Sequence, residues 1–185
     1  MRHDFGAKPW TYPQAVFIIG TYDDADNANA MNAAWGGLSS ATQLILCLSR
    51  RHKTVTNILA RKEFTVSFGD ADHVVECDYL GLVSGSDVPD KIERAGLHVM
   101  KAPNVHAPLF EELPVAMECR LKSYDEKTGL LAADIINVTA DESAMTDGRI
   151  DPDKFRPITF DGANNTYRVL GEIVGKAYHD GGALK

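Results

Sequence analysis

The segment from residue 114 to residue 140 alternates apolar and polar side chains on both sides of one short turn. PVAMECRLKSYDE (114–126) places Val115, Met117, Cys119 and Leu121 on one face and Glu118, Arg120 and Lys122 on the other. The letters KTG then lead into LLAADIINVTA (130–140). A period of two is typical of a strand with one buried face. The segment therefore predicts an antiparallel hairpin whose apolar face lies in the core.

Shorter apolar runs predict further strands at 15–22, 29–35, 43–49, 64–69, 157–160 and 166–170. Helical spacing is limited to short segments at 52–63, 71–83, 88–96 and 151–154. We expect 43–49 to be buried on both faces and 64–69 on one face. Many short strands with a few helices between them favour a mainly β antiparallel barrel over a parallel α/β sheet.

Composition narrows the class of protein. The chain of 185 residues fits one domain, 1–185, and its 44% hydrophobic and 24% charged residues are ordinary for a globular protein. A formal net charge of -7 argues against a general nucleic-acid binder. No apolar run approaches the roughly 20 residues of a membrane span, and the start of the chain lacks a secretory signal. We expect a cytoplasmic protein.

The cysteines and histidines indicate no metal site. Cys47, Cys77 and Cys119 form no CxxC pair, and the 6 histidines show no HxxxH or HExxH spacing. A reducing compartment fits unpaired cysteines. We expect Cys47 and Cys119 to be core residues and favour a structural role for Cys77.

A basic run stands where the strand 43–49 leads into the helix 52–63. It consists of Arg50, Arg51, His52 and Lys53, and Ser49 and Thr54 on either side add hydroxyl donors. A helix N-terminus offers free backbone N–H groups and the positive end of the helix dipole, and Arg and Lys side chains bind phosphate oxygens. The run predicts a phosphate site. The alternative is a solvated basic turn that pairs with nearby acidic side chains.

The segment NAMNAAWGG (29–37) sets one indole among very small side chains. A flat heterocycle can lie against a strand only where the side chains are small, as at Ala33, Ala34, Gly36 and Gly37. Trp35 can then wall or stack on such a ring. The alternative is a core tryptophan beside a glycine bend.

These two segments, in this order, resemble the flavin reductase-like family with the FMN-binding split barrel, in its flavoredoxin-like branch. The resemblance extends over GTYDDADNANAMNAAWGG (20–37), SRRHKTVTNI (49–58), KEFTVSF (62–68), CDYLGLVSGSDVPDKIERAGL (77–97), APLFEELPVAMECRL (107–121) and YRVLGEIVGKAY (167–178). It implies a six-stranded Greek-key split barrel with a few inserted helices. It also implies a homodimer that binds FMN non-covalently near the dimer interface.

The resemblance further implies which residues hold the cofactor. Those beside the isoalloxazine ring and ribityl chain are Asn32, Ala33, Ala34, Trp35 and Gly36. Those in the phosphate segment are Ser49, Arg50, Arg51, Lys53 and Thr54. A third segment near the flavin contributes Ser84, Gly85 and Lys91. The family often has Thr or Ser at the position of Asn32 and Asn at that of Ser67, but Asn32 still supplies a donor and an acceptor.

The implied function is an NAD(P)H-dependent flavin reductase. Hydride passes from NAD(P)H, a transient co-substrate, to FMN N5 and on to free flavin, ferric iron or a small organic acceptor. This chemistry belongs to the cofactor, so no catalytic residue is predicted. One alternative is a flavoredoxin-type electron-transfer flavoprotein reduced by a protein partner. Another is a barrel that binds a different phosphorylated ligand without redox chemistry, since pyridoxine phosphate oxidases have a related barrel.

Overall fold

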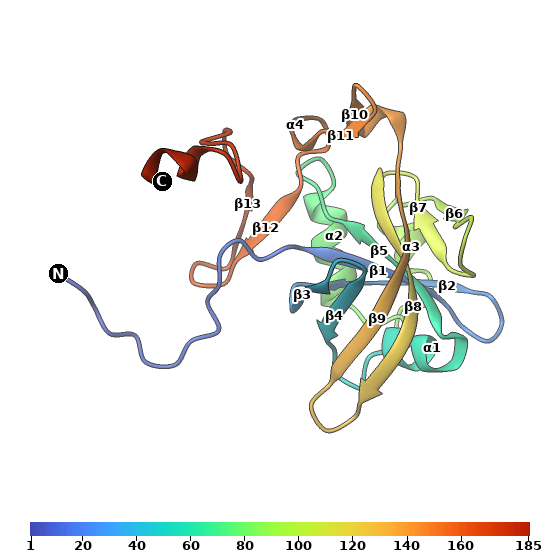
Figure 1. Cartoon of the computed structure of the whole chain (residues 1–185). Helices are drawn as coiled ribbons and strands as arrows, with labels where there is room; N and C mark the ends of the chain where they lie inside the picture. The colour runs from blue at the N-terminus through green and yellow to red at the C-terminus, as the bar shows by residue number, and fades with distance from the viewer.

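The computed structural model describes residues 1–185, and its centre is one antiparallel sheet rolled into a barrel (Figure 1). The strands pair in the order β2-β1-β5-β8-β9-β4-β3. Their bounds are Phe17–Tyr22 (β1), Ala28–Ala33 (β2), Gly36–Ser40 (β3), Gln43–Cys47 (β4), Glu63–Phe68 (β5), Val115–Asp125 (β8) and Leu130–Ala140 (β9). All of these pairings are antiparallel. The predicted mainly β antiparallel fold is confirmed.

The strands β2 and β3 at the two ends of this order are neighbours in the chain. Only Ala34 and Trp35 separate them. The backbone N–H of Cys47 donates to the Trp35 carbonyl at 2.8 Å, so the pairing with β4 continues into the junction. β2 and β3 therefore act as one bent strand that pairs with β1 through its first half and with β4 through its second. Counted in this way, the barrel has the six strands that the resemblance implies.

The main core fills the barrel. Its apolar side chains include Phe17, Ile19, Leu44, Leu46, Val55, Ile58, Phe64, Val66, Met117, Cys119 and Leu131. The prediction that the apolar face of the long hairpin lies in the core is confirmed for Val115, Met117 and Cys119, which are buried. Helix α1 (Lys53–Arg61) contributes Val55 and Ile58, as its spacing predicted, and ends before Lys62, which has a φ of 66°.

A second core lies outside the barrel. Helix α2 (Val74–Leu82) places Cys77 and Leu80 against Ile18 of β1 and Ala30 of β2. Ile92 of the short helix α3 (Lys91–Arg94) joins this cluster. Because α2 and α3 cover the outer face of β1 and β2, neighbouring residues of these strands are buried on opposite faces.

The remaining elements are short. They are β6 (Val99–Lys101), β7 (Pro108–Phe110), η1 (Glu142–Ala144), β10 (Met145–Thr146), β11 (Arg149–Ile150), α4 (Pro152–Phe155), β12 (Ile158–Asp161), β13 (Thr166–Val169) and η2 (Asp180–Leu184). Residues 1–12, the N-terminal arm, and 170–185, the C-terminal arm, leave the barrel on the side of β12 and β13 (Figure 1). None of the helices combines the length and the apolar character that a membrane span requires.

Three predictions about burial are wrong. The segment 43–49 was expected to be buried on both faces, but only the face that carries Leu44, Leu46 and Leu48 is buried. Cys47 was expected in the core but is exposed, because Leu44 and Leu46 turn inward and the alternation of β4 turns Cys47 outward. The segment 64–69 was expected to bury one face, yet Thr65 and Ser67 are completely buried. The Thr65 hydroxyl donates to the Pro108 carbonyl of β7, so β7 covers the outer face of β5.

Burial raises the pKa of the Cys77 thiol to about 12, which agrees with a structural role.

The outer face of β8 is covered as well, at Glu118. This side chain is completely buried and accepts hydrogen bonds from the Asn104 backbone N–H at 2.7 Å, the Asn104 side chain at 2.9 Å and the Asn137 side chain at 2.8 Å. A buried carboxylate is tolerated only with such donors around it. Glu118 therefore ties the loop before β7 to the barrel.

We expect Glu118→Ala to lower the free energy of unfolding by about 3 kcal/mol, because it removes a fully buried side chain and leaves three partly buried donors without their acceptor. The matched variant Glu118→Gln keeps the shape and one acceptor oxygen, so its loss should be smaller. Urea unfolding followed by circular dichroism measures both. Equal stability of the parent and Glu118→Ala would show that the three hydrogen bonds contribute nothing net.

Candidate functional site

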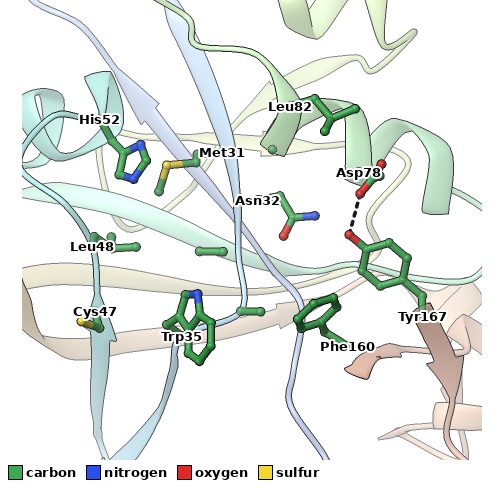
Figure 2. A pocket seen from close by; sticks show the side chains of 13 residues that line it. Met31, Asn32, Trp35, Cys47, Leu48, His52, Asp78, Leu82, Phe160 and Tyr167 are labelled. Atoms are coloured by element: carbon green, nitrogen blue, oxygen red, sulfur yellow. Dashed lines mark hydrogen bonds between the residues drawn. The ribbon is translucent and has the colours of Figure 1, made fainter. Parts of the chain in front are cut away.

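A cleft of about 360 Å³ opens between β2, the C-terminal half of α2 and the β12–β13 hairpin (Figure 2). We call it the ring cleft. Ala33 and Ala34 line it, together with the aromatic side chains of Trp35, Phe160 and Tyr167, which Figure 2 shows along one side of the cleft. Its walls are mostly apolar, and a cleft of this size and shape suits a planar ring system.

Trp35 is not a core residue. Its side chain is 48% exposed and lines the ring cleft. We expected small side chains to leave space for a flat ring, and Ala33 and Ala34 do line the ring cleft. Gly36 serves another purpose, because a Cβ there would lie 2.5 Å from Leu46 Cδ2 and 2.7 Å from the Ile45 carbonyl oxygen. That glycine lets the bent strand approach β4 and does not line the ring cleft.

The polar side of the ring cleft joins two segments that are distant in sequence. The Tyr167 hydroxyl donates to Asp78 Oδ1 at 2.7 Å, which links β13 to α2 (Figure 2). Burial, together with this hydrogen bond, raises the pKa of Tyr167 to about 12. The Asn32 amide donates to the Cys77 carbonyl at 2.8 Å. The hydrogen bond between Tyr167 and Asp78 holds the β12–β13 hairpin beside the cleft, and the one between Asn32 and Cys77 holds α2 against β2.

The ring cleft continues into a second cavity of about 230 Å³, which we call the basic pocket. The two cavities share five lining residues, namely Met31, Asn32, His52, Gly81 and Leu82. The basic pocket adds Lys53, Thr54, Ser84, Gly85 and Lys91. Three segments expected near one ligand thus meet along one continuous cavity.

Lys91 is the most unusual side chain of the basic pocket. It is only 3% exposed, and its Nζ donates to the carbonyls of Leu80 at 2.9 Å and Val83 at 2.8 Å, neither of which carries a charge. Burial, and then the nearby charge of Lys53, lower the pKa of Lys91 to about 8. Partial desolvation, and then Lys91, lower the pKa of His52. The excess of positive charge favours an anion in this pocket.

Asn29 supplies a second sign of a missing ligand. Its Nδ2 donates to Thr54 Oγ1 at 2.8 Å, whereas its Oδ1 is buried without a hydrogen-bond partner. A Cβ on Gly85 would lie 2.1 Å from that oxygen, so glycine is required for the close approach. A buried unpaired acceptor is unfavourable, and a ligand hydroxyl group would satisfy it.

The start of α1 lies in the same pocket. His52 occupies the N-cap position and makes no side-chain capping hydrogen bond. Lys53 Nζ lies 3.4 Å from Asp23 Oδ2, which holds the lysine beside the helix N-terminus. Free N–H groups and a lysine at a helix start form a suitable site for phosphate oxygens.

The structure separates the basic run into two parts. Ser49, Arg50 and Arg51 lie on an exposed turn and line neither cavity. Arg50 Nη1 donates to Thr56 Oγ1 at 2.9 Å, and its Nε lies 3.6 Å from Glu126. The solvated-turn alternative thus describes Arg50, whereas the phosphate prediction agrees with the positions of Lys53 and Thr54.

Several residues of the site were not predicted from the sequence. Asn29, Asp78 and Tyr167 lie in segments that carry the resemblance, but none of them was assigned to the site, and Cys47 was assigned to the core. Phe160 belonged only to a predicted strand near the end of the chain, and Tyr167 to the next predicted strand. Nothing local in the sequence indicates that those strands lie against α2.

Known proteins share this architecture. A family described as Flavin reductase like domain matches residues 10–159. Flavoredoxin of Desulfovibrio vulgaris (Miyazaki F) is 33% identical, with a TM-score of 0.93 over 98% of this chain and 100% of that one. Flavoredoxin from Methanosarcina acetivorans, at 24% identity and a TM-score of 0.89 over 100% of both chains, shows the same fold.

A curated relative is less informative. An uncharacterized protein of Aeropyrum pernix is 30% identical over 112 residues, which are 60% of this chain and 42% of that protein. This chain therefore matches less than half the length of that relative. The family match covers most of this chain, and the Desulfovibrio protein shares its fold from end to end. This chain belongs to the flavin reductase-like domain family.

Proposed function

We propose that this protein is an FMN-binding oxidoreductase of the NAD(P)H-dependent flavin reductase type. Family membership supports a flavin-related oxidoreductase. The observation that carries the proposal is the continuity of the ring cleft with the basic pocket through five shared residues. FMN has a planar ring, a hydroxylated chain and a phosphate in the same order. The cavity offers an aromatic wall, an unpaired acceptor and a positively charged end.

Each part of the cavity has a proposed role. Lys53, Lys91 and the start of α1 bind the phosphate. Asn29 Oδ1 accepts a hydrogen bond from a ribityl hydroxyl, and this contact satisfies the buried oxygen. Ala33 and Ala34 lie beneath the ring, and Trp35 borders it. All of these contacts are non-covalent.

Bound FMN would take a hydride from NAD(P)H at N5 and supply electrons to an acceptor. The chain itself holds the ring in a mostly apolar cleft and restricts water around it. The Tyr167–Asp78 hydrogen bond positions the β12–β13 hairpin at the edge of that cleft. No residue is required as a nucleophile or general base.

The similarity to a flavoredoxin over the whole chain favours one second candidate. In that case the protein carries electrons and receives them from a protein partner instead of NAD(P)H. The cytoplasmic location and the homodimer remain predictions from the sequence and the resemblance.

The two candidates differ in how the flavin is reduced. We expect the purified protein to show a flavin absorption band that bleaches within seconds of adding NADH or NADPH without air. A band that persists with both nucleotides and bleaches only with a reducing protein would favour the electron carrier. A colourless protein that takes up no added FMN would contradict both.

Lys53→Ala should weaken FMN binding about tenfold or more, because it removes a charged hydrogen-bond donor from the phosphate. Arg50→Ala is the matched control, since Arg50 is adjacent in sequence but lies outside the basic pocket. Its effect should be less than about twofold. Titration of flavin fluorescence measures both. Equal losses of FMN affinity in the two variants would indicate that the exposed turn around Arg50 binds the phosphate and would contradict the basic pocket as its site.

FMN affinity should fall as the pH rises through about 8. Lys91, with a pKa of about 8, is charged below that pH and neutral above it. A phosphate stabilises the charged form and raises its pKa, so binding above that pH requires uptake of a proton. The decrease should approach tenfold per pH unit. Lys91→Met should bind weakly with a flatter pH profile. An identical profile in both proteins would show that Lys91 does not bind the phosphate.

A further inference from the structure

His52 stands where the two cavities of the candidate site join. Five residues line both the ring cleft and the basic pocket, and His52 is the only one of them with a titratable side chain. Its imidazole extends from the start of α1 toward Met31 of β2 (Figure 2). A ligand that reaches from one cavity into the other must pass these five residues. His52 therefore lies between the proposed places of the flavin ring and of the phosphate.

The imidazole of His52 is free to interact with a ligand. It makes no capping hydrogen bond at the start of α1, and neither of its ring nitrogens is hydrogen-bonded to another residue. The residue is exposed in the ligand-free cavity, so a proton from solvent can reach the ring. Partial desolvation, and then the charge of Lys91, lower the pKa of His52. The neutral form, which accepts a proton, therefore predominates at neutral pH.

The other titratable side chains around the two cavities are less suited to take up a proton. They are Cys47, Lys53, Asp78, Lys91 and Tyr167. The two lysines are already charged when they bind a phosphate, and a thiol is a weak acceptor. Tyr167 keeps its proton because its pKa is about 12. Asp78 already accepts the Tyr167 hydroxyl at 2.7 Å. His52 remains as the free acceptor.

Reduction of a flavin changes the charge inside such a cavity. A hydride brings two electrons and one proton to the ring, so a neutral oxidised ring becomes negative unless a second proton arrives. A negative charge close to a histidine favours its protonated form. The event that makes the ring negative would therefore make His52 a better proton acceptor.

We propose that the His52 imidazole takes up one proton from solvent when a flavin bound in this continuous cavity is reduced. The inference rests on the proposed function and adds a proton-accepting residue to it. Two electrons and one proton reach the ring as hydride, and the second proton passes from solvent to a ring nitrogen of His52. The total charge of the site is then the same before and after reduction, which favours the reduced flavin.

The midpoint potential of the bound flavin, measured against pH, tests the proton uptake. Each proton taken up with the two electrons changes the ratio of reduced to oxidised flavin tenfold per pH unit, which is about 30 mV. Between about pH 7 and the pKa of Lys91 at about 8, the parent potential should therefore fall by nearly 60 mV per pH unit. His52→Gln should lose one of the two protons and fall by about 30 mV per pH unit.

Two further variants separate charge from proton uptake. His52→Lys keeps a positive charge at every pH of this range, so its slope should also be about 30 mV per pH unit, without the lowered potential that His52→Gln shows at the start of the range. His98→Gln is the matched control, because His98 pairs with Glu112 and lines neither cavity. Its potential should follow the parent at every pH.

Nuclear magnetic resonance of isotope-labelled histidine identifies the group that takes up the proton. At about pH 7.5 the His52 ring should be neutral in the oxidised holoprotein and protonated in the reduced one. An unchanged His52 ring, equal slopes in the parent and His52→Gln, or a slope reduced only in Asp78→Asn would each overturn the proposal and leave the flavin site intact. A protein that binds no FMN would overturn the proposed function together with this inference.

Discussion

The closure of the barrel depends on the junction at Ala34 and Trp35. There a single strand leaves β1 and continues along β4, and the hydrogen bond from the Cys47 N–H to the Trp35 carbonyl maintains the pairing. Gly36 permits the approach to β4, since any side chain would collide with Leu46 and the Ile45 carbonyl. The bend also turns Trp35 out of the core. The feature that closes the barrel thus builds one wall of the ring cleft.

The basic pocket rests on a different constraint, the burial of positive charge. Lys91 is buried against uncharged carbonyls, and Lys53 stands at an uncapped helix start a short distance away. The burial of Lys91 is unfavourable without an anion, whereas Lys53 is already paired with Asp23 Oδ2 at 3.4 Å. A phosphate bound in this pocket would offset the buried positive charge. Because the pocket opens into the ring cleft, this stabilisation favours a compound that carries both a phosphate and a ring.

Two cavities of the protein share the wall that Trp35 forms. Ala34, Trp35 and Cys47 line both the ring cleft and a cavity of about 450 Å³ along β3. A change in the position of the indole would therefore alter both cavities. In the basic pocket, Asn29 Oδ1 is a buried acceptor without a partner, and a hydroxylated ligand would satisfy it.

The sequence by itself determined most of the barrel strands and the longer helices, together with the general position of the site, whereas β3, β6 and β7 were not predicted. Period-two alternation predicted β8 and β9, and the helix beginning near Lys53 was correctly placed. Only the tertiary structure decided which strand faces are covered, as the burial of Glu118 and Ser67 and the exposure of Cys47 show. It also separated Lys53 from Arg50 and brought Tyr167 to Asp78. A local sequence pattern shows the periodicity of side chains along one segment. Which strand faces are covered, and which residues meet in the site, depends on contacts between segments far apart in the chain.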